Sequence, residues 1–268
     1  MGQKTTLAII GACILIAAYS FIFQPSNERD WNRDQTVLTQ TEFDGDLAHV
    51  KNIRNNSYRN TTDYDVRHYD ATYNLSELRR AWFIVEPFST KGAAHTLVSF
   101  EFEGPRYLAV SVEIRKEQGE SFSAVKGLFR QYELMYVIGD EEDLIKLRSN
   151  HRKDTVYLYP VNTTQEKARR MLESMLTEAN ELAAQPKFYN TLVSTCTTNI
   201  VKHANEVTPD RVPLDWRILA PAHADEYALE IGLLDVEETT INAARERHRI
   251  NDRALDESLG PFSERIRK

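Results

Sequence analysis

Cys196 is the residue whose type and position best suit covalent chemistry. It follows Ser194 and Thr195, either of which fits the N-cap of a helix that continues through Thr197-Thr198-Asn199. Unpaired backbone N–H groups and the helix dipole at such a start stabilise a thiolate, and the same N–H groups stabilise an oxyanion on an attacked carbonyl. The pattern therefore favours a nucleophilic thiol. The structural alternative is a small buried cysteine that packs the helix start.

A catalytic thiol needs an imidazole base, and the imidazole needs an acceptor that orients it. His95 and Glu113 suit these roles because they lie on two predicted strands, 94–102 and 106–116, which Glu103-Gly104-Pro105 separates. Counting outward from the turn places His95 opposite Glu113 on one face, with Cβ atoms about 5 Å apart. We therefore predict that these two residues are the base and the orienting group for the thiol. The alternative is an ordinary cross-strand pair at the rim of a sheet.

Arg54, Tyr58 and Ser111 are the residues predicted to contact the substrate. The first two lie in a stretch dense in Asn, Arg, Asp and Tyr, and Ser111 shares the face of His95 by strand alternation. The alternative is that the Tyr-rich stretch covers a sheet edge. His203 lies seven residues after the cysteine, but two ligands do not make a zinc site, and neither Cys-x-x-Cys nor His-Glu-x-x-His is present. We predict no metal and no cofactor.

The elements that must position these residues indicate an α+β fold. Further strands are predicted at 81–86, 133–139 and 155–160, a short helix at 140–148, and an amphipathic helix at 164–184 with apolar residues at three- and four-residue steps. We expect an antiparallel sheet packed with helices, in a permuted papain-like arrangement if the resemblance described below holds. One N-terminal transmembrane helix is expected to precede it.

The segment Leu7 to Phe23 is 17 residues long and carries no charge. At 1.5 Å per residue it spans roughly 26 Å, close to the ~30 Å hydrocarbon core of a bilayer. Lys4 precedes it, so the positive-inside tendency leaves the N-terminus in the cytoplasm and exports the rest of the chain. The alternatives are a cleaved signal peptide, which lacks a good small-x-small site here, and a lipoprotein signal ending at Cys13.

Composition is that of a globular protein, with 41% hydrophobic and 27% charged residues. The net charge of −7, with no basic block to offset it, argues against a nucleic-acid partner. Cys13 and Cys196 are the only two cysteines, and the first falls in the apolar segment. The exported part therefore has no internal disulfide, and a lone exported thiol is buried, reactive or paired with another molecule.

The predicted organisation has four parts. Residues 1–24 form the membrane anchor, 25–50 a polar and extended lead-in, 51–235 the α+β domain, and 236–268 a charged helical tail on the surface. This arrangement predicts a single-pass protein of the bacterial inner membrane, with its domain facing the periplasm.

Five segments together resemble the Lnb N-terminal periplasmic domain family. They are NIRNNSY (52–58), AHTLVSFEF (94–102), YLAVSVEIRKEQGESFSAVKGLFRQYELMYVIGDEEDLIKLR (107–148), VYLYPV (156–161) and FYNTLVSTCTTNIVKH (188–203). That family is similar to permuted papain-like, NlpC-like thiol enzymes, in which the His-bearing strand precedes the Cys-bearing helix. The resemblance implies that Cys196 carries an acyl chain as a thioester and passes it to an amine, with His95 as base and Glu113 as the polar third residue. Asn56 replaces an aromatic residue of the family pattern, and Lnb-type proteins carry further membrane segments.

Three functions follow for this membrane-tethered domain. The first is cysteine-dependent acyl transfer on lipoproteins or lipids. The second is a cysteine amidase or peptidase that acts on cell-envelope peptides. The third is a non-catalytic binding or scaffold protein of the envelope. An apolar groove beside the thiol favours the first, a polar open cleft the second, and a thiol distant from His95 the third.

Overall fold

The computed structural model describes residues 2, 5, 10, 23–88, 92–209 and 211–268. Among these residues, no helix has the length and apolar character needed to cross a membrane. The predicted anchor, 1–24, lies almost wholly outside the described residues, so the transmembrane helix stays a prediction.

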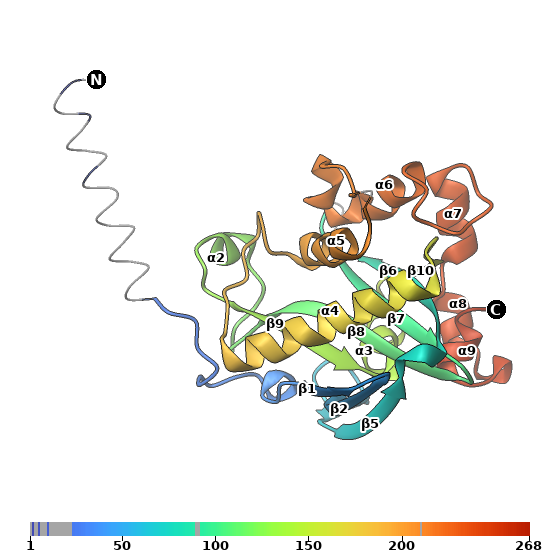
Figure 1. Ribbon diagram of the computed structural model, residues 1–268, viewed down its shortest axis with the longest axis horizontal. Coiled ribbons are helices and arrows are strands. Elements are labelled where there is room, and N and C mark those ends of the chain that lie inside the picture. The colour runs from blue at the N-terminus through green and yellow to red at the C-terminus, as the bar shows by residue number, and fades with distance from the viewer. Residues whose placement is uncertain (1, 3–4, 6–9, 11–22, 89–91, 210) are drawn as a thin grey trace.

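A large mixed sheet forms the centre of the molecule (Figure 1). Within the described residues it has eight strands, in the order β1-β2-β9-β8-β7-β6-β10, and β5 pairs with β2 outside this path. The strands are β1 (Gln40–Asp44), β2 (Leu47–Arg54), β5 (His68–Asn74), β6 (Leu78–Pro87), β7 (Ala94–Phe102), β8 (Arg106–Arg115), β9 (Glu133–Gly139) and β10 (Tyr157–Pro160), with the separate small pair β3 (Ser57–Tyr58) and β4 (Tyr64–Asp65).

Helices cover both faces of this sheet and enclose two cores. The helices are α2 (Ala124–Leu128), α3 (Glu141–Lys146), α4 (Gln165–Ala184), α5 (Cys196–Val207), α6 (Ala224–Glu230), α7 (Ile241–His248), α8 (Asn251–Leu255) and α9 (Phe262–Arg265), and a π-helical turn (Leu147–Arg152) extends α3. The first core lies under α4 and α5 and includes Val98 and Phe100 of β7. The second lies under α3, α8 and α9 and includes Leu97 of the same strand. Adjacent residues of β7 therefore pack into different cores, on opposite faces of the sheet.

The predicted hairpin is confirmed, and its register holds as far as the pair of Leu97 and Ser111, whereas the predicted pair of His95 and Glu113 lies beyond the end of the ladder. Phe102 pairs with Arg106 and Leu97 with Ser111, as counting outward from Gly104 requires. Gly104 takes φ +72°, a left-handed conformation in which a side chain is strained, so glycine fixes the turn. The amphipathic helix is also confirmed as α4, with the Thr164 side chain accepting from the Lys167 N–H as its cap.

The expected all-antiparallel sheet is wrong in one place. β2 and β9 pair in parallel, at Arg54 and Gly139. A short turn would force two strands to be antiparallel, but a long stretch of chain connects β2 to β9, so they can also pair in parallel. The contact is close: a Cβ added to Gly139 would lie 2.8 Å from the Arg54 carbonyl oxygen. Glycine at this position therefore permits the pairing.

Two terminal segments are more ordered than expected. The lead-in 25–50 contains β1 and the start of β2, because Thr41, Ala48 and Val50 are buried against the sheet and α4. The charged tail 236–268 is not a surface helix. It forms α7, α8 and α9, whose apolar residues Ile250, Ala254, Phe262 and Ile266 belong to the second core.

Candidate functional site

Ser111 joins His95 to Glu113. The His95 Nε2 lies 2.6 Å from the Ser111 Oγ, and that hydroxyl donates to the Glu113 Oε1 at 2.8 Å. The direct distance from Nε2 to the carboxylate is 3.9 Å. The structure therefore brings these three predicted residues together, with Ser111 as a bridge instead of a direct histidine–glutamate hydrogen bond.

The direction of this chain assigns the imidazole tautomer. An ionised carboxylate only accepts, so the single Ser111 hydroxyl hydrogen goes to Glu113. The serine oxygen must then accept from His95, which places the imidazole hydrogen on Nε2. Nδ1 keeps its lone pair, and within the described part of the chain it has no hydrogen-bond partner. It is the atom able to take a proton.

Arg148 controls the charge of this group, and no pattern in the sequence predicts this role. Its Nη2 donates to Glu113 at 2.9 Å and its Nε to Glu86 at 2.7 Å. Burial and the Arg148 charge lower the pKa of His95 to about 3, although Glu113 opposes the shift. Burial alone would raise the pKa of Glu113, but Arg148 and its neighbours outweigh burial and hold that pKa well below its usual range. The imidazole is therefore neutral and the carboxylate ionised at neutral pH.

Glu86 lies beneath this group and is fully buried. Burial raises its pKa to about 7, against the attraction of Arg148 and Arg152. Its Oε1 has no hydrogen-bond partner in the described structure and faces the Arg152 Nη1 only as an ion pair at 3.5 Å, so burial outweighs the two cations.

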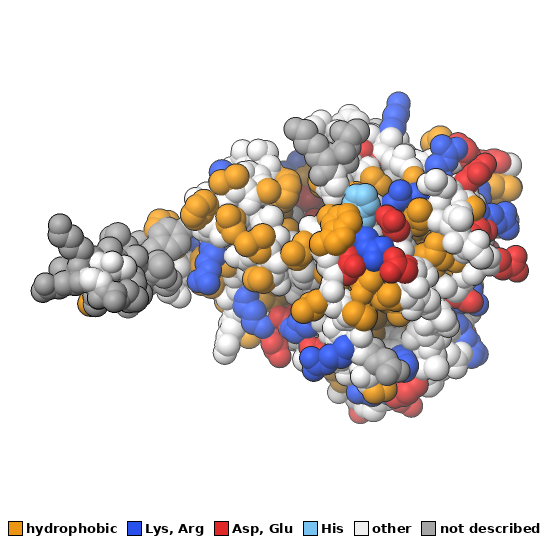
Figure 2. All heavy atoms as spheres, turned by 90° about the horizontal axis from the view of Figure 1, so that it is seen from above, with side chains coloured by type: hydrophobic (Ala, Val, Ile, Leu, Met, Phe, Trp, Pro, Cys, Tyr) orange, Lys and Arg blue, Asp and Glu red, His pale blue; other side chains and the backbone are white. Residues whose placement is uncertain are grey.

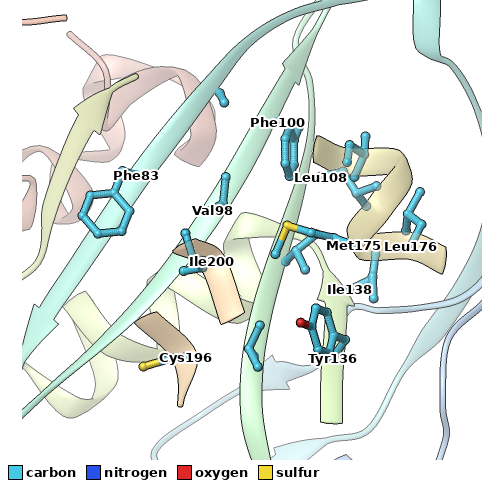
Figure 3. Close-up of a cluster of buried hydrophobic side chains, with 14 of the residues drawn as sticks. Phe83, Val98, Phe100, Leu108, Tyr136, Ile138, Met175, Leu176, Cys196 and Ile200 are labelled. Atoms are coloured by element: carbon cyan, nitrogen blue, oxygen red, sulfur yellow. The ribbon is translucent and has the colours of Figure 1, made fainter. Parts of the chain in front are cut away.

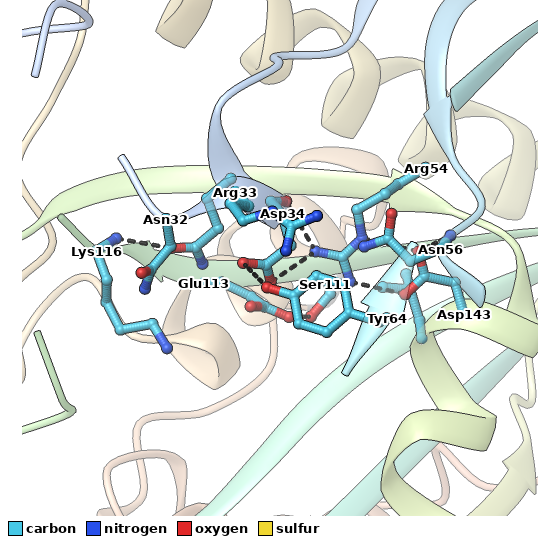
Figure 4. Close-up of polar contacts among 12 residues, drawn as sticks. Asn32, Arg33, Asp34, Arg54, Asn56, Tyr64, Ser111, Glu113, Lys116 and Asp143 are labelled. Carbon is cyan, nitrogen blue, oxygen red and sulfur yellow. Dashed lines mark hydrogen bonds and ion pairs between the residues drawn. The ribbon is translucent and has the colours of Figure 1, made fainter. Parts of the chain in front are cut away.

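Asp143 holds Arg54 (Figure 4) and also Tyr58, the two side chains predicted to contact substrate. The Arg54 Nε and Nη2 each lie 2.9 Å from an Asp143 oxygen, and the Tyr58 hydroxyl donates to the same carboxylate at 3.2 Å. Only 4% of the Arg54 side chain is exposed. The structure places both side chains in a buried ion-pair cluster beside Ser111 and Glu113, so their contact with substrate stays a prediction.

Cys196 begins α5, as predicted, with Thr195 as N-cap. A capping box joins Thr195 and Thr198: each side chain accepts the backbone N–H of the other residue. Within the described residues, the N–H groups of Cys196 and Thr197 have no hydrogen-bond acceptor. The predicted pair of oxyanion donors at the helix start is therefore available.

The thiol is buried in the first core, near Val98 and Ile200 (Figure 3). Its sulfur contacts the Thr197 Oγ1 at 3.8 Å. His95 projects from the opposite face of β7, the face of Leu97, and the two side chains make no hydrogen bond. The structure therefore does not bring the thiol and the imidazole into contact, and a working cysteine–histidine pair stays a prediction.

The two strands separate at the level of His95. The β7–β8 pairing ends at Leu97 and Ser111, whereas β8 continues along β9 to Arg115. α5 contacts both β7 and β8, and at its start the Thr197 hydroxyl lies 3.0 Å from that of Thr96 on β7. The thiol and the imidazole thus both lie near the end of the β7–β8 ladder, on opposite faces of the sheet.

An apolar cavity of about 430 Å³ opens along α5. Thr197, Ile200 and Val201 line it from the helix, opposite Phe83 and Val98 of the sheet. Its size falls within the roughly 300–1,000 Å³ of small-molecule sites. Among the described lining residues, only Lys167 and Arg211 are charged, and both are cationic. The cavity suits an apolar chain with an anionic end.

The described residues contain no group of three or more His, Cys, Asp or Glu side chains able to hold a metal ion. His203, considered as a metal ligand, is buried between two hydroxyl groups. Its Nε2 lies 2.7 Å from the Tyr136 oxygen, and its Nδ1 lies 2.7 Å from the Ser174 oxygen. It is a hydrogen-bonded core histidine.

Residues 64–222 match the model of the Lnb N-terminal periplasmic domain family. No curated protein and no solved structure matched this chain significantly. The matched region covers more than half of the chain and contains His95, Ser111, Glu113 and Cys196, whereas Arg54 and Tyr58 precede it. The family indicates a periplasmic location. The chain belongs to the Lnb N-terminal periplasmic domain family.

Proposed function

We propose that this protein is a membrane-anchored periplasmic thiol acyltransferase in which Cys196 forms a thioester. The His95 Nδ1 takes the proton of the Cys196 thiol, and the resulting thiolate attacks an acyl ester carbonyl. The N–H groups of Cys196 and Thr197 hold the tetrahedral oxyanion, and the alcohol leaves with the proton that the imidazolium gives back. An amine then attacks the thioester, loses its proton to the His95 Nδ1, and releases the thiolate. Ser111 and Glu113 keep the imidazole in the required tautomer.

The apolar cavity is the observation that carries this proposal. Thr197 lines it, and the hydroxyl of that residue lies 3.8 Å from the Cys196 sulfur. Cys196 itself does not line the cavity, so an acyl chain there would reach the thiol at the Thr197 end, with Lys167 and Arg211 as partners for an anionic group. A peptide substrate has no such match, because peptides need a polar cleft. The lining therefore favours lipids or lipoproteins over the amidase alternative.

The order of the elements supports a permuted papain-like arrangement. The strand that bears His95 precedes the helix that bears Cys196, as in the thiol enzymes that this family resembles. Catalysis requires the imidazole to approach the sulfur at the level where the β7–β8 ladder ends, because the two side chains start on opposite faces of the sheet.

The experiment is thioester capture by an activated acyl probe, with the full chain in detergent or lipid. We expect wild-type protein to take up the label, and neutral hydroxylamine to remove it, as a thioester requires. Cys196→Ser should abolish hydroxylamine-sensitive labelling. The matched control is Cys13→Ser, which removes the other cysteine and should leave labelling unchanged. Labelling that persists in Cys196→Ser contradicts the proposal.

A non-catalytic envelope protein is the second candidate, and one observation favours it. His95 and Cys196 lie on opposite faces of the sheet without a hydrogen bond between them, so the thiol can serve as a packing residue of the first core. This candidate predicts no labelling of the wild-type protein, and it predicts lost stability in Cys196→Ser because a hydroxyl is buried without a partner.

A further inference from the structure

Two neighbouring loops form an exposed apolar tip at one end of the molecule. We call this surface the apolar tip; it comprises residues 122–130, which include α2, and residues 190–194. Its exposed side chains are Phe122, Val125, Leu128, Phe129, Leu192 and Val193. Val193 is 76% exposed and Val125 65%. In Figure 2 hydrophobic side chains lie exposed at the left-hand end of the domain.

The two loops are held together as one surface. The Thr191 hydroxyl donates to the Ala124 carbonyl at 2.8 Å. A Cβ added to Gly127 would lie 2.5 Å from the Thr191 Oγ1 and about 3.1 Å from the Tyr189 ring, so α2 packs tightly on the other loop. The apolar side chains are therefore presented by a supported structure.

The chain enters the domain beside this tip. The Ser26 N–H donates to Glu133, and Arg29 forms ion pairs with Glu133 and Glu117. Glu133 in turn bridges to Phe188, which precedes the second loop. The uncharged segment 7–23 ends directly before these contacts. A membrane reached by that segment lies next to the apolar tip.

Charge also distinguishes the tip from the rest of the protein. The segment 121–131 contains Lys126 and Arg130 and no acidic residue, and the segment 188–195 has no charge. Lys126 forms an ion pair of 3.6 Å with Glu120, directly before this segment, which leaves Arg130 as the cation of the tip with no ion pair among the described residues. The whole chain has a net charge of −7. Apolar side chains flanked by cations match a bilayer surface that contains anionic lipids.

We infer that the apolar tip docks on the bilayer, with its side chains among the lipid headgroups, as a second membrane contact besides the N-terminal segment. This inference does not depend on chemistry at the thiol. Val193 lies three residues before Cys196, so docking places the start of α5 at the lipid surface.

Tryptophan quenching by brominated lipid tests this inference on the full chain. The chain is reconstituted in vesicles of brominated phosphatidylcholine and phosphatidylglycerol, and native fluorescence is subtracted from that of Val193→Trp. The matched control is Leu255→Trp, at an exposed site of 62% on α8 in the C-terminal tail. An interfacial side chain lies roughly 5–10 Å deep, so we expect the V193W signal to be quenched at least about twofold more than the L255W signal. Adding Val125→Glu to V193W should reduce its quenching.

Equal quenching of V193W and L255W contradicts docking of the apolar tip on lipid. Absence of V193W quenching in a chain that floats with the vesicles contradicts it as well. A chain that does not float with lipid overturns it too. Sedimentation without lipid tests the other occupant, a second copy of the chain: self-association that shields V193W and that Val125→Glu disrupts also contradicts docking on lipid. Circular dichroism should give the native spectrum for each variant, because all three positions are exposed.

Discussion

The Ser111 hydroxyl decides which nitrogen of His95 is free. Because it must donate to Glu113 and accept from Nε2, the proton-accepting atom is Nδ1. Arg148 and burial keep the ring neutral, so it is ready to accept a proton but is a weak base until a negative charge arrives. A thiolate or tetrahedral oxyanion close to the ring supplies such a charge.

His95→Gln should slow acyl labelling by roughly 10²–10⁴-fold, because general-base assistance is lost. Ser111→Ala should slow it by roughly 10–100-fold, since the imidazole loses the partner that fixes its tautomer. The rate of probe uptake measures both, and the pH profile of Ser111→Ala should change shape if Ser111 is a positioning residue. Unchanged uptake in His95→Gln means that another group is the base.

His95 also gives a prediction for stability against pH. Its pKa is about 3 in the folded protein, below its ordinary value of 6.5, so the unfolded chain binds the proton first as pH falls. The stability that the folded protein gains with His95 neutral is present above pH 6.5 and is lost as the pH falls from 6.5 to 3. At about 1.4 kcal/mol per pH unit, roughly 3 kcal/mol should be lost between pH 6.5 and 4.

Urea unfolding of wild type and His95→Gln at several pH values measures this effect. The variant should lose less free energy of unfolding than wild type over that pH range, because glutamine does not titrate. Titratable groups that do not interact with His95 are common to both proteins and cancel in the difference, and Glu113, which His95 helps to keep ionised, stays ionised over this pH range. Parallel pH dependences would show that His95 is not held neutral by its surroundings.

At this scale the sequence indicates the right residue types but not their partners. His95, Ser111 and Glu113 share a face because strand alternation is local. Arg148 belongs to a π-helical turn, and no sequence pattern places its side chain between Glu86 and Glu113. The opposite-face position of Cys196 depends on how α5 crosses the sheet, which is a long-range property.

At the scale of elements, the capping box stabilises the helix start that bears the thiol. Thr195→Ala should lower the free energy of unfolding by about 1 kcal/mol, because the N–H of Thr198 loses its acceptor. The midpoint of urea unfolding measures this change. Thr195→Ser keeps the hydroxyl and is the control. A loss as large in the serine variant would assign the effect to the methyl group and not to the cap.

The hairpin and α4 were predictable because short-range rules determine both. A turn centred on Gly104 sets the register of β7 and β8, and the apolar spacing of α4 sets its buried face. The parallel contact of β2 and β9 was not predictable in this way. It depends on strands far apart in the sequence, and its one local sign is Gly139, where the backbones approach too closely for a side chain.

At the scale of the whole molecule, the C-terminal tail completes the second core. Phe262 is 4% exposed, so Phe262→Ala should cost about 3–5 kcal/mol of unfolding free energy through the cavity it leaves. Leu255→Ala, at an exposed position nearby, should change it by less than about 0.5 kcal/mol. Denaturant unfolding of both variants compares them. A small effect of Phe262→Ala would mean that the tail is not part of the cooperative unit.

This role of the tail could not be predicted from the sequence because the tail helices are short. α8 and α9 contain five and four residues, too few for an apolar stripe to repeat. Charged residues therefore separate the buried apolar positions of the tail, and no repeating pattern in the sequence connects them. These positions are Ile250, Ala254, Phe262 and Ile266. Arg267 adds to the contact by ion-pairing with Glu141 of α3.

The buried tail also sets the timing of folding. Ile250 and Ile266 close a face of the sheet whose central strands are made from residues far upstream. During export of a periplasmic domain, β6 to β9 emerge first, with Leu97, Ala109 and Val137 uncovered on that face until the residues around Ile266 have crossed. An exported chain of this design needs protection from aggregation, by a chaperone or by fast transit, over the interval between these two events.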